Sequence, residues 1–323
     1  MLKLILGAAM AVLAAACGIV SSTSNAPDAR TATEQTQALV VNDVARLRDF
    51  SLFRECDDCP EMIVLPGGEF QMGSNAHETL GPPRRMHVRR FAIGRDKVTL
   101  RQWAACVEAG ACDAAVLSFA HTQEVCAVIA RSEGISATGC TPEAWTRVDG
   151  PVGGLNWQRA HAFVGWLNQT AGPLDEAPYR LASEAEWEYA MRANANYPWE
   201  DGAAMCQQAL GASCESMGEG RLGQVEFYNG SLRTPSGPNA FGLRDFFPTL
   251  EIVEDCYARS ISSLPDDGMP LSATGCNERT IRVIGYEARA SQTTWGRFPY
   301  SPDGDSAGAG SFITLRVARS LGD

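Results

Sequence analysis

The sequence predicts an α+β domain with much irregular structure, and three observations lead to this class. Short apolar runs early in the domain have the length and composition of strands, whereas later segments place an N-cap residue before apolar residues at helical spacing. Glycine and proline interrupt much of residues 202–310. The chain also has eleven cysteines, a number typical of an exported protein in which disulfides hold loops together.

The first segment has the features of an export signal. Lys3 is the only charged residue among the first 20, and residues 4–16 form an apolar run of 13. This run is shorter than the ~20 residues that a membrane-spanning helix needs. It ends in three alanines before Cys17, which favours cleavage at this point and attachment of lipid to the thiol. A general cleavage site with an incidental cysteine is the alternative.

The remaining chain is predicted to contain a tether and one domain. Residues 18–44 are rich in Ser, Thr, Asn, Ala and Gln and offer little to bury, which indicates a flexible segment. No second linker and no internal repeat follow. We therefore expect a signal peptide over residues 1–16, a lipidated cysteine and tether over 17–50, and a single domain over 51–323.

The first elements of the domain are predicted to be strands. Met62–Leu65 and Phe70–Met72 flank Pro66-Gly67-Gly68 and suggest a β-hairpin. His87–Ile93, where Val88 and Phe91 lie among Arg and His, suggests one further strand.

Three helices follow. Thr99 has the character of an N-cap for a helix over residues 100–109, which Gly110 would end. Asn156 precedes apolar residues at helical spacing from Trp157 to Leu167. Ser183 and Glu186 form a capping box ahead of a third helix.

No residue pattern predicts a catalytic or metal site. Glu184, Glu186 and Glu188 could suggest acid–base chemistry, but carboxylates in a first helical turn also complement the helix dipole. The pair Cys56 and Cys59 could be a redox dithiol, but two aspartates separate them and would disfavour a thiolate. The four histidines are not spaced as a metal site, and Asp303-Gly-Asp305 is as expected for a plain turn.

Six segments, in order, resemble the formylglycine-generating enzyme, or sulfatase-modifying factor, family. The strongest reads Tyr179-Arg-Leu-Ala-Ser-Glu-Ala-Glu-Trp-Glu-Tyr-Ala190. The others are Glu61–Ser74, Phe91–Thr99, Pro151–Trp157, Pro238–Asp245 and Leu315–Arg319. The resemblance implies one loop-rich α+β domain, related to C-type lectins, over about residues 60–319.

Spacing alone leaves the connectivity of the ten remaining cysteines open, although it suggests that neighbours pair in order. Some family members carry a Cys-x-x-Cys before the first strand and further pairs like those here. The resemblance thus implies the disulfides Cys56–Cys59, Cys106–Cys112, Cys206–Cys214 and Cys256–Cys276. Cys126 and Cys140 lie in what resembles an extra loop and would pair with each other.

The departures from the family bear on cofactors. Family oxidases hold copper(I) with two thiolates near the C-terminus, but this chain has no cysteine after Cys276. The matching stretch, residues 289–300, contains Trp295 and Arg297, which we take as candidate binding residues for a ligand or partner. The family segment that helps to bind calcium is replaced by Phe247–Glu254. We therefore expect no copper and no metal site, and no calcium is implied.

The sequence therefore favours an accessory or binding lipoprotein of the cell envelope that is not an oxidase. The alternative is a family enzyme that acts on a protein or small-molecule substrate by oxidation or other chemistry. The net charge of −11 argues against nucleic acid and against anionic lipid headgroups, which leaves the lipid as the expected membrane contact. Gly18 is not the aspartate that favours inner-membrane retention, so we expect the outer membrane, facing the periplasm. The expected partner is an envelope protein or a small ligand.

Overall fold

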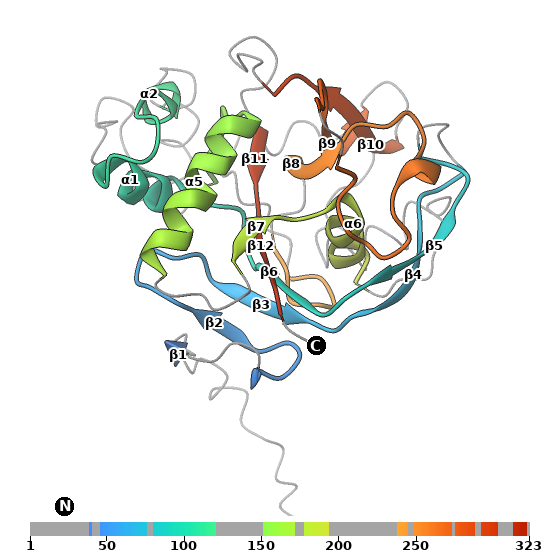
Figure 1. The fold of residues 1–323 in the computed structure, drawn as a ribbon, viewed down its shortest axis with the longest axis horizontal. Helices are drawn as coiled ribbons and strands as arrows, with labels where there is room; N and C mark the ends of the chain where they lie inside the picture. The colour runs from blue at the N-terminus through green and yellow to red at the C-terminus, as the bar shows by residue number, and fades with distance from the viewer. Residues whose placement is uncertain are drawn as a thin grey trace, which may run out of the picture. The chain divides into compact units, whose positions relative to one another are not determined.

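The computed structural model describes residues 39–40, 46–75, 80–120, 151–171, 178–193, 238–244, 249–272, 275–287, 292–302 and 313–321. Residues 38–323 form one unit by their contacts. Its strands make a six-stranded sheet in the order β1-β2-β3-β6-β12-β7, a four-stranded sheet in the order β10-β9-β8-β11, and a two-stranded sheet of β4 and β5 (Figure 1). In the described ranges, no helix has the length and apolar character needed to span a bilayer.

The six-stranded sheet is built mainly from short strands. These are β1 (Leu39–Val40), β2 (Leu52–Arg54), β3 (Met62–Leu65), β6 (Phe91–Gly94), β12 (Val317–Ser320) and β7 (Tyr179–Leu181). Strand β1 lies within the segment predicted as a tether and pairs in parallel with β2. The tether is therefore not entirely free of secondary structure.

The predicted hairpin of Met62–Leu65 with Phe70–Met72 is wrong. Strand β3 pairs with β2 and β6, whereas β4 (Gly68–Met72) pairs with β5 (Arg84–Val88). The register is continuous, since Leu65 opposes Phe91 and Gly68 opposes Val88. The antiparallel segments over residues 62–72 and 84–94 thus bend at the same point. A Cβ on Gly67 would lie 2.8 Å from the backbone of Arg90 and Val88, so the bend requires glycine at this position.

The prediction of one strand over His87–Ile93 is also wrong, because the chain bends within this segment. The structure divides it into β5 and β6, and Arg89 and Arg90 lie at the break, opposite Pro66 and Gly67. The sequence did not reveal this because the break contains neither glycine nor proline. The closely packed partner segment imposes it.

The three helices begin at the predicted residues. Thr99 caps α1 (Leu100–Glu108) in a capping box with Gln102, Asn156 caps α5 (Trp157–Thr170), and Ser183 with Glu186 forms the predicted box of α6 (Glu184–Arg192). A shorter helix, α2 (Ala115–Ala120), follows α1. Gly110 has a φ of 74°, as expected for the residue that ends a helix.

Two apolar clusters lie on opposite faces of the six-stranded sheet, because side chains alternate along each strand. Met62 and Ala92 join the cluster that contains Trp103 of α1 and Phe163 of α5. Ile63 and Ile93 join the other cluster, with residues of α6 such as Trp187.

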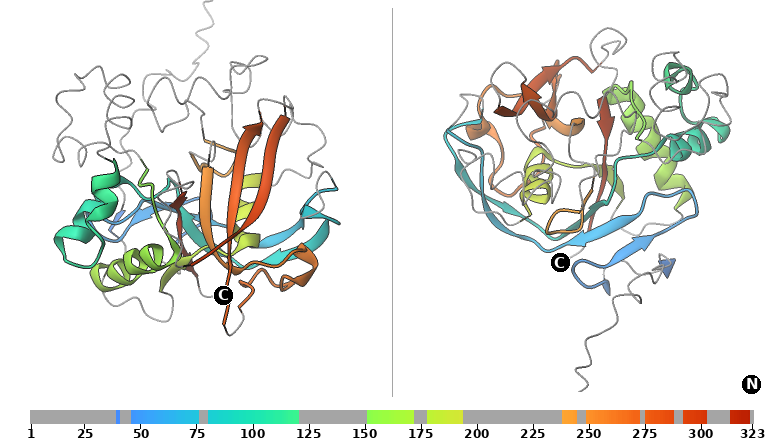
Figure 2. Two further views of the ribbon diagram at one scale, coloured as in Figure 1. Left: turned by 90° about the horizontal axis from the view of Figure 1, so that it is seen from above. Right: turned by 180° about the vertical axis from the view of Figure 1, so that it is seen from behind.

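The four-stranded sheet lies where the sequence indicated mainly loops. Figure 2 shows its long strands side by side. They are β8 (Thr249–Cys256), β9 (Arg279–Glu287) and β10 (Gln292–Tyr300), and the short β11 (Ile313–Leu315) completes the sheet. Arg316 separates β11 from β12, so a single C-terminal segment belongs to both sheets.

Candidate functional site

The candidate binding residues Trp295 and Arg297 both lie on strand β10. Trp295 opposes Ile284 and Arg297 opposes Arg282 in the ladder with β9. A residue that binds a ligand or partner has to be accessible, but Arg297 is only 1% exposed. Of Trp295, only the place in the strand lies within what the structure describes.

Arg297 is held by a carboxylate from helix α6. Its Nε and Nη2 donate to Oε1 and Oε2 of Glu184 over 2.5 and 2.8 Å, and its Nη1 donates to the carbonyl of Ala258. Burial disfavours the charge, but Glu184 outweighs this effect and raises the pKa of Arg297 above its ordinary value. The Arg297 guanidinium is therefore engaged in contacts inside the protein.

A second arginine, Arg282 of β9, joins α6 to the same sheet. It donates to Glu184 and to Glu188, each over 2.8 Å, and its guanidinium lies 4.9 Å from the ring centroid of Trp187. Glu188 also pairs with Arg192 and accepts the Gly73 amide at 2.7 Å. Burial alone raises the pKa of Glu188, but Arg192 and Arg282 outweigh it and lower the pKa below its ordinary value.

The third glutamate of the helix, Glu186, forms a two-point ion pair with Arg180 at 2.6 and 2.7 Å. All three carboxylates of α6 are thus paired with arginine. This arrangement favours the structural interpretation over acid–base chemistry. For Glu184 and Glu188 the cause is ion pairing inside the core, which the helix-dipole argument did not anticipate.

A further buried pair connects the two large sheets. Glu251 of β8 accepts from the indole of Trp187 at 3.0 Å and pairs with Arg316 at 3.1 Å. Arg316 also donates to the carbonyls of Gly94 and Arg95. Glu251 lies in the segment that replaces the family's calcium-binding stretch, and its carboxylate is engaged by these two partners.

Asp255 is a buried carboxyl group at the end of strand β8. It accepts the amides of Glu184 and Leu271 at 2.6 and 2.7 Å, and so joins helix α6 to the loop between Cys256 and Cys276. Burial, with the nearby charge of Glu184, raises the pKa of Asp255 to about 8. The folded protein therefore retains a proton that the unfolded chain would lose in mild acid.

This shift predicts a pH dependence of stability. Between the ordinary pKa of 3.8 and the raised value of about 8, the folded state binds more protons than the unfolded state, so Asp255 makes stability fall as pH rises. We expect Asp255→Asn to remove this slope, about 1.4 kcal/mol per pH unit at its steepest. Urea unfolding at several pH values from 4 to 9 would measure it.

The control for this experiment is Asp267→Asn, since Asp267 is exposed and its carboxylate accepts the local Met269 amide at 3.1 Å. Its unfolding free energy should follow the wild-type pH profile. An equal profile for Asp255→Asn and the wild type would contradict the retained proton.

Three of the predicted disulfides lie within the described residues, and the structure contains all three: Cys56–Cys59, Cys106–Cys112 and Cys256–Cys276. Cys126, Cys140, Cys206 and Cys214 lie outside the described residues, so their pairing stays a prediction.

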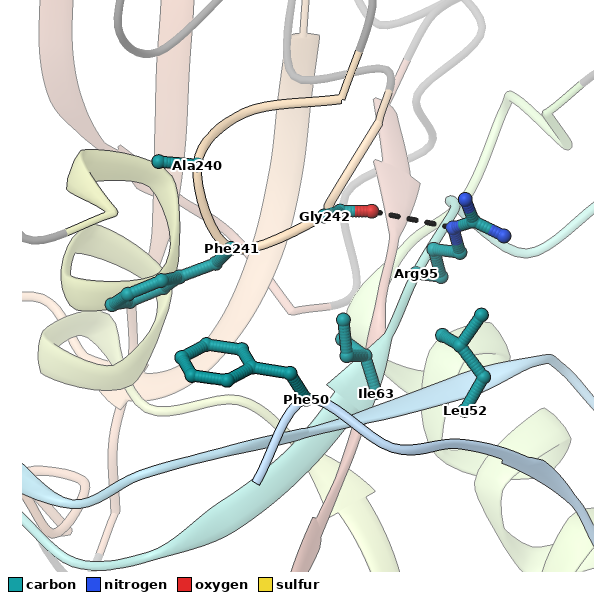
Figure 3. Close-up of a pocket in the computed structure, with 7 residues that line it drawn as sticks. All are labelled: Phe50, Leu52, Ile63, Arg95, Ala240, Phe241 and Gly242. Atoms are coloured by element: carbon teal, nitrogen blue, oxygen red, sulfur yellow. Dashed lines mark hydrogen bonds between the residues drawn. The ribbon is translucent and has the colours of Figure 1, made fainter. Parts of the chain in front are cut away.

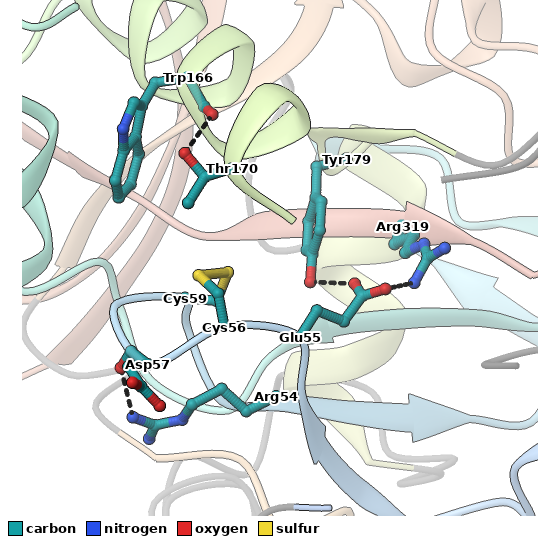
Figure 4. Close-up of a disulfide and its surroundings, with 9 residues drawn as sticks. All are labelled: Arg54, Glu55, Cys56, Asp57, Cys59, Trp166, Thr170, Tyr179 and Arg319. Atoms are coloured by element: carbon teal, nitrogen blue, oxygen red, sulfur yellow. Dashed lines mark hydrogen bonds and ion pairs between the residues drawn. A yellow bond between two sulfur atoms is a disulfide. The ribbon is translucent and has the colours of Figure 1, made fainter. Parts of the chain in front are cut away.

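The first disulfide lies beside a polar contact that the sequence did not indicate (Figure 4). Glu55 accepts from the Tyr179 hydroxyl and pairs with Arg319 of β12, whose guanidinium lies 5.6 Å from the Tyr179 ring centroid. Burial and the charge of Glu55 raise the pKa of Tyr179 above its ordinary value. These contacts join the loop before β3 to the C-terminal strand β12. A disulfide in a loop held in this way is consistent with a structural role.

The side chains of strand β10 and the late cysteines do not fit a copper(I) site. Soft thiolates select this ion, but β10 has no cysteine, its Arg297 is a bonded cation, and Cys256 is joined to Cys276. Across the described ranges, no group of three or more His, Cys, Asp or Glu side chains is placed to hold a metal ion.

One polar cluster was missed by the sequence argument. Nε2 of His161 of α5 lies 2.9 Å from a carboxylate oxygen of Glu254, and its ring contacts that of Trp157 at a tilt of 40°. The Trp157 ring centroid also lies 4.1 Å from the Arg279 guanidinium. His161 and Trp157 are four residues apart on one helix, a spacing that could have suggested their contact. The cluster attaches α5 to strands β8 and β9.

Comparison with known proteins gives a consistent assignment. The sulfatase-modifying factor enzyme 1-like domain matches residues 50–321. A formylglycine-generating enzyme of Thermomonospora curvata is 28% identical over 167 residues, which cover 43% of this chain and 52% of the relative. The inactive C-alpha-formylglycine-generating enzyme 2 of Mus musculus is 28% identical over 166 residues, covering 43% and 51%. The matched part is thus about half the length of each relative.

Solved structures share the fold. PvdO from Pseudomonas aeruginosa superimposes with a TM-score of 0.59 at 24% identity, covering 85% of this chain and all of that one. Treponema denticola variable protein 1 gives 0.51 at 18% identity, covering 80% and 94%. With the domain match over residues 50–321, these findings show that the chain belongs to the sulfatase-modifying factor enzyme 1-like domain family.

Proposed function

We propose that this protein is an accessory or binding lipoprotein of the cell envelope and not a formylglycine-generating oxidase. The observation that carries the proposal is the state of the late cysteines. The sequence has none after Cys276, and Cys276 is bonded to Cys256. The family reaction needs a thiolate pair that holds copper(I) and engages the substrate thiol, and this pair has no counterpart on β10.

The names of the relatives do not decide between an active and an inactive protein. One is called an enzyme and the other inactive, and both are 28% identical to this chain. The chemistry of the chain's own residues is therefore the support for the non-oxidase function.

We expect no aldehyde when the purified protein is incubated with copper(I), O₂, a reductant and a sulfatase-type Cys-x-Pro-x-Arg peptide. Mass spectrometry of the peptide checks this result, with a copper-only reaction as the background and an active family oxidase as the positive control. Turnover above the copper-only background would overturn the proposal.

The envelope location depends on Cys17. Replacing it, Cys17→Ser, is expected to release the protein from membranes or to leave the signal uncleaved, because the thiol is the proposed lipid attachment point. Fractionation of the cells and mass spectrometry of the N-terminal peptide measure both effects. An unlipidated N-terminus in the wild-type protein would contradict the anchor.

A further inference from the structure

Arginine side chains gather close to the point where the chain enters the domain. Arg46 and Arg48 are exposed in the segment that precedes strand β2, and Arg89 is exposed at the bend between β5 and β6. Arg90 joins the two segments, because its Nε donates to a carboxylate oxygen of Asp49 at 3.0 Å. These four arginines and Asp49 are called the arginine face below.

The arginine face has an excess of positive charge that is not neutralised locally. Its four arginines and one aspartate give a net charge of +3, whereas the whole chain has a net charge of −11. Arg48 and Arg89 make no hydrogen bond or ion pair within the described part of the chain. Other arginines near the surface have carboxylate partners, as in the pairs Arg85–Glu69, Arg95–Glu61 and Arg244–Asp96.

An exposed aromatic ring adjoins these cations. Phe50 directly follows Asp49 and is 48% exposed. Its ring contacts that of Phe241 at a centroid distance of 5.6 Å, beside a pocket of about 290 Å³ that Leu52 and Ile63 also line (Figure 3). The contact with Phe241 holds the ring in place while part of it stays open to solvent. Cations beside an exposed apolar side chain are typical of surfaces that lie against a lipid headgroup region.

The local charge, and not the average over the chain, decides what this face attracts. The argument from the net charge of −11 treats the surface as uniform. At physiological ionic strength salt screens charges beyond about 8 Å, so a surface in contact with the arginine face is affected mainly by its arginines. A net charge of +3 next to anionic lipid favours the bound orientation on the order of a hundredfold.

The proposed anchor keeps one such surface close to the domain. Cys17 lies 22 positions before Leu39, the first residue of β1, and this length of chain spans at most about 75 Å when fully extended. Strand β1 pairs with β2, and the arginine face begins six positions after β1, at Arg46. A tethered surface has a high effective concentration, so even a weak contact with it is populated.

We propose that the arginine face lies against the anionic phospholipid headgroups of the leaflet that holds the anchor. This inference rests on the proposed envelope lipoprotein and names the surface that its domain contacts. Arg48 and Arg89 donate to headgroup phosphates, and the Phe50 ring enters the boundary between headgroups and acyl chains. The contact orients the domain and leaves the four-stranded sheet free to meet other molecules.

The test is amide hydrogen exchange of the purified lipoprotein in vesicles of two compositions. One is phosphatidylcholine alone and the other contains about 30% phosphatidylglycerol, so both hold the same anchor and differ in surface charge. We expect exchange over residues 46–50 and 89–90 to be at least about threefold slower in the anionic vesicles, and about 0.5 M NaCl should remove the difference. Equal exchange in the two vesicle types would overturn the proposal.

Variants separate the contact from folding. The double variant Arg48→Gln, Arg89→Gln should lose the slower exchange, while its midpoint of thermal unfolding stays within about 3 °C of the wild type because both side chains are exposed. Arg259→Gln removes another exposed arginine, in the loop after Cys256, and should keep the slower exchange. Slower exchange that persists in the double variant would contradict the role of the arginine face.

Failure of this proposal can be distinguished from failure of the proposed function. An unlipidated Cys17 would be seen in the N-terminal mass and would overturn the anchor. The dependence on vesicle charge is still measured in that case, with vesicles in excess, because it is a difference between two lipid compositions. The aldehyde assay does not involve the arginine face.

Discussion

Replacing Glu184 with glutamine is expected to lower the free energy of unfolding by about 3–5 kcal/mol. Glu184 is the shared partner of Arg282 and Arg297, and all three side chains are at most 1% exposed. Glutamine removes the negative charge that balances the two buried guanidinium groups, and an uncompensated buried charge is costly. Urea unfolding at neutral pH would measure the change.

The matched control is Glu69→Gln, because Glu69 pairs with Arg85 on the surface, where both side chains are more than half exposed. This variant should cost less than about 1 kcal/mol. If Glu184→Gln yields no folded protein, the double variant Glu184→Gln with Arg297→Met should recover part of the stability, because it also removes the unpaired cation. A Glu184→Gln variant as stable as the control would contradict the role of the buried ion pairs.

Removal of the disulfide between Cys256 and Cys276 is expected to have the next largest effect. The two residues are 20 positions apart, and a crosslink over a loop of this length stabilises a protein by about 3 kcal/mol through the unfolded state. We expect the double variant Cys256→Ala, Cys276→Ala to lose this amount in urea unfolding without reductant.

Its control is the pair Cys56→Ala, Cys59→Ala, since those residues are only 3 positions apart and close a short loop. The loop-entropy model gives a smaller loss, about 2 kcal/mol. The loop between Cys256 and Cys276 is also held by Ser183, whose hydroxyl donates to the Gly268 carbonyl at 2.6 Å. A loss well below that of the short-loop control would indicate that such contacts, and not the crosslink, hold the loop.

Much of the helical structure followed from local residues. The caps at Thr99, Asn156 and Ser183 were predictable because an N-cap acts on amides only two or three residues away. The family assignment and the three described disulfides were also predictable, since they depend on ordered segments of the chain itself.

Strand pairing depended on contacts distant in sequence. The segment from Met62 to Met72 has the composition of a hairpin, but the bend at Gly67 turns both halves toward a second segment instead. In strands β8 and β9, buried charges such as Glu251 and Arg282 obscure the alternating pattern that marks a strand. Their partners lie on another element, so local sequence indicated loops.

Contacts between distant segments also explain why the sequence did not reveal the surroundings of the candidate site residues. A sequence shows that Arg297 is a cation but not that Glu184, 113 positions earlier, neutralises it inside the core. It shows Phe50 but not that the ring stands beside Phe241 over the floor of a pocket. Helix caps, the family assignment and the cysteine pairs depend on short segments of the chain, so the sequence alone determined them. Burial and charge neutralisation depend on which distant segments pack together, so only the tertiary structure decided them.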